Sequence, residues 1–348
     1  MSTLKILNLK NNILKNSIVK VFCIIIFQIA LLTGCANNTV SPERNIMEEN
    51  KLVIYTSHKE EIYGPIVREF EERTGIWVDV ITGGTNEMLD RIKTEGNESA
   101  DVMFGGGVDS LSVYSSCFES YKSNQADVLS DSYASENDSY TVFSKLPIVI
   151  CYNTRLMHSA GKPRSWSDLL DVYWKGKIAF ADPTKSGSSY TALYTLGQLT
   201  EDETGSFDKS IELFKYNLNG EVLSGSGDVM DKIISGEKVL GIVLEESALK
   251  EMAKNTDIGI IYPREGITAV PDGCAIVKNA KHMENAKLFL EFTVCDDVQR
   301  LLEDRLYRRS VRTDYDNSDI KEVIYNLNNS LKIRDELIEE FENEADNS

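Results

Sequence analysis

The hydrophobic pattern of the first folded part of the chain alternates short apolar runs with segments of helical spacing. Ile62, Ile66 and Phe70 lie four residues apart and predict one buried face of a helix, and Gly75 stands where a helix C-cap glycine belongs. Apolar runs that predict buried strands flank this helix and recur after it, at 52–55, 77–81 and 101–104. This β-α-β-α-β order predicts a parallel sheet with helices on its faces.

The next long apolar run, 145–152, has no helix just before it and predicts a strand that carries the chain into a second lobe. Pro271-Asp272-Gly273 predicts a turn into a short strand at 274–277, which we interpret as the return crossing. Gly-Ser-Gly at 225–227 predicts a loop. Further strands are expected at 178–181, 239–244 and 258–262, and helices at 166–173, 187–199, 228–235, 283–293 and from 296 onward.

The N-terminal residues predict a targeting segment rather than part of the fold. Four lysines and no acidic residue precede an apolar run at 21–32, which is too short for a spanning helix. The run ends in Leu32-Thr33-Gly34-Cys35, which resembles the bacterial lipoprotein signal, in which the cysteine is lipidated after cleavage. The alternatives are a plain secretory signal and an uncleaved anchor. The 14 residues at 37–50 are almost devoid of apolar side chains and predict a flexible tether.

These patterns predict an α/β protein of two doubly wound lobes joined by crossing strands, with C-terminal helices. The expected boundaries are a signal peptide at 1–34, a tether at 35–50, lobe one at 51–144 and 268–300, lobe two at 145–267 and 301–340, and an acidic tail at 341–348.

The charge balance excludes several kinds of partner. The whole chain has 37 basic and 55 acidic residues, and the predicted signal removes four lysines, which leaves 33 against 55, or a net charge of −22. Such an acidic chain does not fit nucleic acid, or peripheral binding to anionic lipid. Four cysteines remain after Cys35 and lie far apart without a Cys-x-x-Cys pair, which argues against a zinc site. A disulfide is permitted outside the cell, and the sequence does not choose among its three pairings, so four free, mostly buried thiols are the simpler expectation. They are Cys117, Cys151, Cys274 and Cys295.

Small, polar or charged residues follow the predicted strands, in place of bulky apolar ones. Ligands of open α/β sheets bind outside the carboxyl ends of the strands, so we treat these residues as candidates for ligand binding. The candidates are Ser57, His58, Thr85, Gly106, Gly107, Ser186, Gly187, Ser188, Ser189, Glu245, Glu246 and Asp272. Among them, the 186–189 segment precedes a predicted helix, whose first N–H groups and dipole favour an anion.

Each candidate also fits an ordinary structural role. The serines suit a helix N-cap, His58 a surface position at a helix start, the glycines a simple turn, the two glutamates the first turn of a helix, and Asp272 a Pro-Asp-Gly turn. Catalytic motifs are missing from the sequence: it has no Gly-x-Ser-x-Gly, Walker loop, His-Glu-x-x-His or dinucleotide fingerprint. Glu245 and Asp272 could form a hydrolase dyad, but nothing in the sequence suggests the partner acid. We therefore expect a binding protein without a cofactor rather than an enzyme.

The sequence resembles the extracellular solute-binding lipoproteins of ABC importers, in the branch of ferric-iron, phosphonate and sugar-phosphate binders. The likeness runs from Lys51 to Arg312 and includes VIYTSHKEE, the glycines after the third strand, ADPTKSGSSYTAL, YPREGITAVPDGCAIVKNAKHMENAKLFLEF and the late RRSVR. It implies a type II periplasmic-binding fold that closes around one ligand. It also implies a permease and its ATPase subunits as partners, and a monomer held at the cell surface or in the periplasm by the Cys35 lipid.

The resemblance leaves the ligand open. Iron-binding members use two adjacent tyrosines after a strand of the second lobe, and a histidine in the first loop. His58 matches the histidine, but Glu245-Glu246 occupy the tyrosine positions. His58 and Glu245 could still hold a hard cation. We expect a phosphorylated or phosphonate compound instead, with its anion on Ser57 and the 186–189 segment and its hydroxyls or amine on Glu245 and Asp272. A sensor or enzyme component on the same fold is the further alternative.

Overall fold

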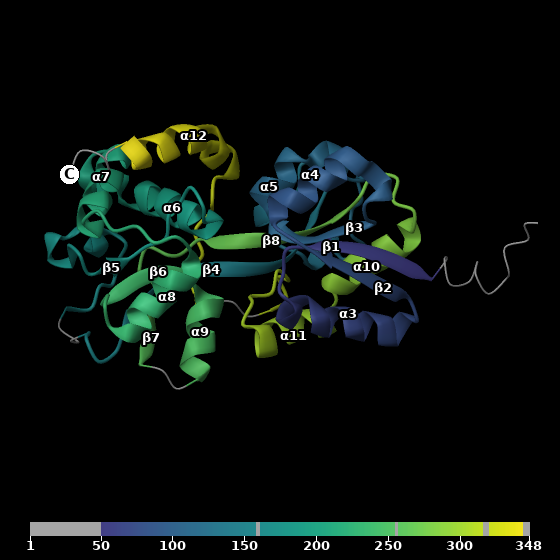
Figure 1. The fold of residues 1–348 in the computed structure, drawn as a ribbon, viewed down its shortest axis with the longest axis horizontal. Coiled ribbons are helices and arrows are strands. Elements are labelled where there is room, and N and C mark those ends of the chain that lie inside the picture. Colours follow the sequence, from purple (N-terminus) through teal and green to yellow (C-terminus); the bar gives the residue numbers. More distant parts are fainter. Residues whose placement is uncertain (1–49, 158–160, 255–256, 316–319, 344–348) are drawn as a thin grey trace, which may run out of the picture. The chain divides into compact units, whose positions relative to one another are not determined.

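Figure 1 shows the computed structural model of the chain. It describes residues 50–157, 161–254, 257–315 and 320–343. The predicted signal peptide with Cys35, nearly all of the predicted tether and residues 344–348 of the predicted acidic tail lie outside this part. None of the described helices is long and apolar enough to cross a membrane.

Eight strands form one continuous sheet, in the order β2-β1-β3-β8-β4-β6-β5, with β7 also paired to β4. Strands β1, β2 and β3 are parallel to one another, as are β5 and β6, whereas β8 runs antiparallel to β3 and to β4. The strands are β1 Lys51–Thr56, β2 Trp77–Thr82, β3 Val102–Gly107, β4 Thr141–Asn153, β5 Ile178–Ala179, β6 Leu240–Leu244, β7 Ile258–Ile261 and β8 Ala269–Ile276.

Helices cover both faces of each half of the sheet. Beside β1–β3 and β8, one face carries α3 Glu60–Thr74, α10 Met283–Thr293 and α11 Asp296–Leu306, and the other carries α4 Thr85–Glu95 and α5 Val108–Val113. Beside β5–β7, one face carries α6 Gly187–Thr204, α7 Phe207–Leu218 and α12 Leu327–Asn343, and the other carries α8 Ser226–Ser235 and α9 Glu245–Ala253. Short 3₁₀ turns lie at Gly96–Glu98, Ser115–Cys117, Ala126–Val128, Asp131–Tyr133, Ser167–Leu170 and Val172–Trp174.

Strand β4 joins the two halves. Its first part, up to Pro147, pairs with β8, and its second part, from Ile148 on, lies between β6 and β7. Each half also buries its own apolar clusters on both faces of the sheet, and a smaller cluster that includes Val142 of β4, Tyr194 of α6 and Phe207 of α7 packs residues of both halves together. We propose that the halves are two lobes, and we call the half with β1–β3 and β8 lobe one and the half with β5–β7 lobe two.

The predicted turn at Pro271-Asp272-Gly273 is wrong. These residues lie inside β8, where Asp272 pairs with Gly107 of β3 on one side and with Ser144 of β4 on the other. Because β8 pairs with a strand on each side, this pairing overrides the local preference of Pro-Asp-Gly for a turn. The consequence for function is that Asp272 is held on a central strand rather than on a loop.

Three helix predictions need correction. The predicted helix at 166–173 is two 3₁₀ turns, the second of which is capped by the Asp171 side chain on the Tyr173 amide. Helix α8 begins at Ser226, so part of the predicted Gly-Ser-Gly loop is the first turn of a helix. The C-terminal region is not helical throughout, because described residues between α11 and α12 form bends and short bridges.

The glycines at 105–107 lie within β3 and not in a loop after it. Between Phe104 and Gly107 the register against β8 shifts, because β3 has one residue more than its partner there. Gly105 has a φ of 98°, and an added Cβ would lie 2.4 Å from Nε2 of His58. This bulge therefore needs glycine both for its backbone conformation and for the close approach of the imidazole.

Gly105→Ala should destabilise the protein by about 2 kcal/mol or more, because it adds a left-handed non-glycine residue and a clash with the His58 ring. Gly227→Ala is the matched control, since an added Cβ there meets nothing within 4 Å and the residue lies in α8. Urea unfolding should show a large loss for the first variant and none for the second. Equal stabilities would contradict the packing described for the bulge.

Candidate functional site

Asp272 is the buried carboxylate around which the predicted site residues gather. Its side chain is only 5% exposed, and its Oδ1 accepts a hydrogen bond of 2.8 Å from the Gly106 amide. Its Oδ2 lies 2.6 Å from Nη1 of Arg308 and 3.0 Å from Nε2 of His58. The His58 contact lacks hydrogen-bond geometry, so it stabilises the carboxylate as an ion pair when the ring is protonated. Burial alone raises the pKa of Asp272, but His58 and Arg308 outweigh it and hold that pKa below its ordinary value.

Arg308 extends the network to α9 of lobe two. Its side chain is 6% exposed, and its Nε lies 3.2 Å from Oε2 of Glu246, again without hydrogen-bond geometry. Glu246 also accepts a hydrogen bond of 2.6 Å from Lys250, one turn further along α9. Lys250 in turn donates to Glu61 of α3 at 2.9 Å.

Glu245, the neighbour of Glu246, is fully buried and binds a second arginine. Arg309 donates from Nε and Nη2 to the two carboxylate oxygens of Glu245, at 2.9 and 2.7 Å, which is the bidentate geometry that favours Arg–carboxylate pairs. Tyr262 donates its hydroxyl to the same carboxylate. Burial and then the Glu245 charge raise the pKa of the Tyr262 hydroxyl, so it remains a donor across the physiological range.

Local backbone features place the two arginines. Helix α11 ends at Leu306, and Tyr307 takes the left-handed conformation with a φ of 56°, which turns the chain away from the helix axis. The backbone of Arg309 then exchanges two hydrogen bonds with that of Lys145 on β4, at 2.9 and 3.0 Å. Arg308 and Arg309 are thereby fixed beside the strand that joins the two lobes.

A second group of predicted residues forms a cluster of hydroxyls in lobe two. Ser186 caps α6, because its hydroxyl accepts from the Ser189 amide at 3.3 Å. The same hydroxyl lies 3.0–3.1 Å from those of Ser188, Ser189 and Ser226. Ser226 is the first residue of α8, so the N-termini of α6 and α8 meet at this cluster. We call Ser186, Ser188, Ser189 and Ser226 the serine cluster.

The structure thus gathers most predicted site residues into two groups. The ion-pair network contains His58, Gly106, Glu245, Glu246 and Asp272, and the serine cluster contains Ser186, Ser188 and Ser189 and adjoins Gly187, the first residue of α6. Thr85 lies at the edge of the network, since a Cβ on Gly106 would come within 3.0 Å of its methyl group. Ser57 is half-buried next to His58 in the chain, and Gly107 precedes α5 as its N-cap.

Sequence reasoning missed Glu61, Lys250, Arg308, Arg309 and Tyr262 of the network and Ser226 of the serine cluster. Arg308-Arg309 is a signal that could have been found in the sequence, because two adjacent cations in so acidic a chain are expected to pair with carboxylates. Ser226 was hidden by the interpretation of Gly-Ser-Gly as a loop. Tyr262 carries no signal of its own, since its role depends on the fold.

The alternative metal ligands His58 and Glu245 belong to different ion pairs, with Asp272 and with Arg309. Within the described ranges, no three His, Cys, Asp or Glu side chains converge in a way that could hold a metal ion. The four cysteines are free thiols; Cys151 and Cys274 are buried, and Cys117 and Cys295 half-buried. Burial raises the pKa of Cys151 to about 12, so this thiol is unreactive.

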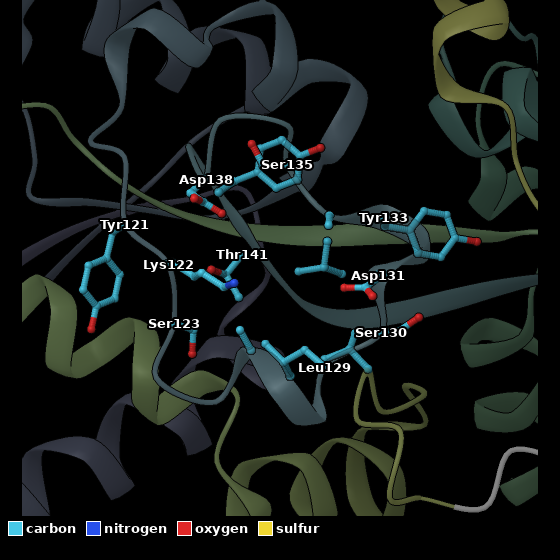
Figure 2. A pocket seen from close by; sticks show the side chains of 15 residues that line it. Tyr121, Lys122, Ser123, Leu129, Ser130, Asp131, Tyr133, Ser135, Asp138 and Thr141 are labelled. Atoms are coloured by element: carbon cyan, nitrogen blue, oxygen red, sulfur yellow. The ribbon is translucent and has the colours of Figure 1, made fainter.

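Two cavities lie elsewhere, and the segment between α5 and β4 lines part of each. The one shown in Figure 2, of about 170 Å³, lies among Tyr121, Leu129, Asp131, Asp138 and Thr141. A larger one of about 480 Å³ lies between residues 132–140 and 324–331. Neither is lined by a residue of the ion-pair network or of the serine cluster.

Comparison with known proteins decides the family. Residues 98–323, more than half of the chain, match the family model described as bacterial extracellular solute-binding protein. The chain belongs to this family. It is a periplasmic solute-binding protein of an ABC importer, and so a transport protein rather than an enzyme, which confirms the predicted family and role.

The relatives of this solute-binding protein differ in ligand. "Iron uptake protein A1" of Synechocystis is 25% identical over 302 residues, which cover 81% of each chain. The "Putative 2-aminoethylphosphonate-binding periplasmic protein" of Salmonella typhimurium is 23% identical over 271 residues, 72% of this chain and 74% of that one. The periplasmic binding protein AfuA of Actinobacillus pleuropneumoniae, solved with fructose 6-phosphate, has 23% identity and a TM-score of 0.71 over 86% of this chain and 99% of that one. This likeness confirms the predicted type II periplasmic-binding fold.

Asp272→Asn should destabilise the protein at neutral pH by about 3–5 kcal/mol, because it removes the charge that compensates Arg308 in a buried pair. The folded pKa of Asp272 is lowered, so its contribution to stability is complete above its ordinary value of 3.8 and is lost as the pH falls through the folded value. Denaturant unfolding at pH 7 and at a series of pH values below 3.8 should therefore show a flatter acid decline in the variant than in the native protein.

The control is Asp314→Asn, which removes an exposed partner of Arg312 and should leave stability almost unchanged. Native-like stability of Asp272→Asn at pH 7 would show that the network does not hold the fold together.

Proposed function

We propose that this protein captures a small phosphorylated or phosphonate-bearing solute between its lobes and delivers it to a membrane permease. The observation that carries the proposal is the convergence of two helix N-termini, those of α6 and α8, on one cluster of four serine hydroxyls. Helix N-termini supply free amide donors and a positive dipole end, and the hydroxyls add further donors. Relatives named for a phosphonate and for a sugar phosphate support this ligand class.

The acidic surface does not prevent capture of an anion. The predicted mature charge of −22 slows long-range approach, but surface charges more than about 10 Å away are largely screened at physiological salt. The donors of the serine cluster act at contact distance, where screening is small. The local site therefore outweighs the net charge.

We propose that the rest of the solute is neutral and carries hydroxyls. In the ion-pair network, the four carboxylates of Glu61, Glu245, Glu246 and Asp272 face Arg308, Arg309, Lys250 and His58. An amine would have to displace one of these cations to reach a carboxylate, whereas a hydroxyl can donate to an oxygen that is already paired. This balance favours a sugar phosphate over an aminoalkylphosphonate.

We further propose that the mature protein is a monomer held at the outer face of the cytoplasmic membrane by a lipid on Cys35. The lipoprotein-like box at 32–35 and the polar segment after it support this anchor.

Replacing Ser188 and Ser226 by Ala should weaken binding of fructose 6-phosphate about tenfold or more for each hydrogen bond removed, because a hydrogen bond to a charged group contributes about 1.5–3 kcal/mol. Neither residue is the cap of its helix, so folding should be unaffected. Calorimetry with a panel of sugar phosphates, 2-aminoethylphosphonate and ferric iron measures the effect.

Ser206→Ala is the matched control. Ser206 caps α7 in the same way that Ser186 caps α6, but it lies beyond the opposite end of the 18-residue α6, about 27 Å away at 1.5 Å per residue. It should leave affinity unchanged. Tight binding of iron that depends on His58 and Glu245, with no binding of any phosphate or phosphonate, would overturn the proposal.

A further inference from the structure

Glu246 pairs with two cations, and each of these cations also pairs with a carboxylate of lobe one. On one side Arg308 lies between Glu246 and Asp272, which sits on β8. On the other side Lys250 lies between Glu246 and Glu61, which sits on α3. Glu246 itself belongs to the first turn of α9 in lobe two. Two carboxylates of lobe one are thus linked to one carboxylate of lobe two through two shared cations.

The two arms differ in burial. The Arg308 arm is sealed, with side-chain exposures of 6% for Arg308, 12% for Glu246 and 5% for Asp272. The Lys250 arm is open to solvent, with 29% for Lys250 and 61% for Glu61. Buried charges left without partners are costly, whereas exposed pairs contribute little. Of the two arms, the Arg308 arm therefore contributes more. It acts beside the buried bidentate pair of Arg309 and Glu245, which links the same segment to α9.

Lobe separation would disturb this arrangement in a specific way. Arg308 is fixed to lobe one by its 2.6 Å bond to Asp272, and its position is tied to β4 through the backbone of Arg309. Moving α9 away would leave Glu246 with Lys250 alone and would open the side of Arg308 that faces Glu246. The network opposes such a movement without any ligand.

We propose that Glu246, Arg308 and Lys250 form a clamp that holds the two lobes together in the ligand-free protein. The clamp goes beyond the proposed function, because it sets the population of closed molecules before any solute binds. A solute must then enter through the minor open population, so the clamp limits the rate of capture and slows release.

Small-angle scattering of the ligand-free protein tests the clamp directly. Glu246→Gln keeps the shape of the side chain but removes the charge on which both arms converge, and should raise the ratio of open to closed molecules tenfold or more. The radius of gyration should rise accordingly. Glu251→Gln is the matched control, because Glu251 also lies on α9 but pairs with Lys254, the C-cap residue of that helix. It should keep the native radius.

Lys250→Met removes only the exposed arm and should expand the protein less than Glu246→Gln, with Lys254→Met as its control. If Glu246→Gln fails to fold, the comparison of Lys250→Met with Lys254→Met tests the clamp instead. Native radii in every folded variant, with native circular dichroism, would overturn the clamp. Because no ligand is added, failure of the clamp is distinct from failure of the phosphate proposal, which depends on the serine cluster.

Discussion

The buried carboxylate of Asp272 is the constraint on which the centre of this protein depends. A charge on a central strand of a sheet must be compensated, and the chain meets this need from three distant segments: the loop after β1, the bulge of β3 and the turn after α11. Arg308 pairs with Asp272 and at the same time lies against Glu246 at the start of α9. The glycines of β3, the left-handed Tyr307 and the pairing of Arg309 with β4 all serve to bring these groups together.

In the proposed function, the two groups of site residues have different roles in ligand recognition. Each carboxylate of the ion-pair network faces a cation, so in our proposals this group holds the lobes and meets neutral hydroxyls. The serine cluster presents hydroxyls and two helix N-termini, with Lys185 nearby paired to Asp182. Under this proposal, an acidic protein binds an anion through uncharged hydroxyl and amide donors.

The architecture could be predicted from the sequence because the apolar runs of β1–β3 and β6 and the helical spacing of α3 are strong and regular. It also indicated three of the four serines and the carboxylates of Glu245, Glu246 and Asp272, because polar residues near the ends of predicted strands are candidates for ligand binding. It could not reveal that β8 runs through Pro271-Asp272-Gly273, because that depends on two strands distant in the chain. Nor could it indicate that Glu245, Glu246 and Asp272 have arginine partners, because Arg308 and Arg309 approach only when α11 has packed and ended.

Native mass spectrometry of protein purified from cells under mild conditions, with phosphorus and iron quantified in the same sample, tests the central claim most directly. The account predicts one small molecule per chain with one phosphorus atom, and its loss when Ser188 and Ser226 are both replaced by Ala. Stoichiometric iron without phosphorus, retained in that double variant and lost on replacement of His58, would contradict it.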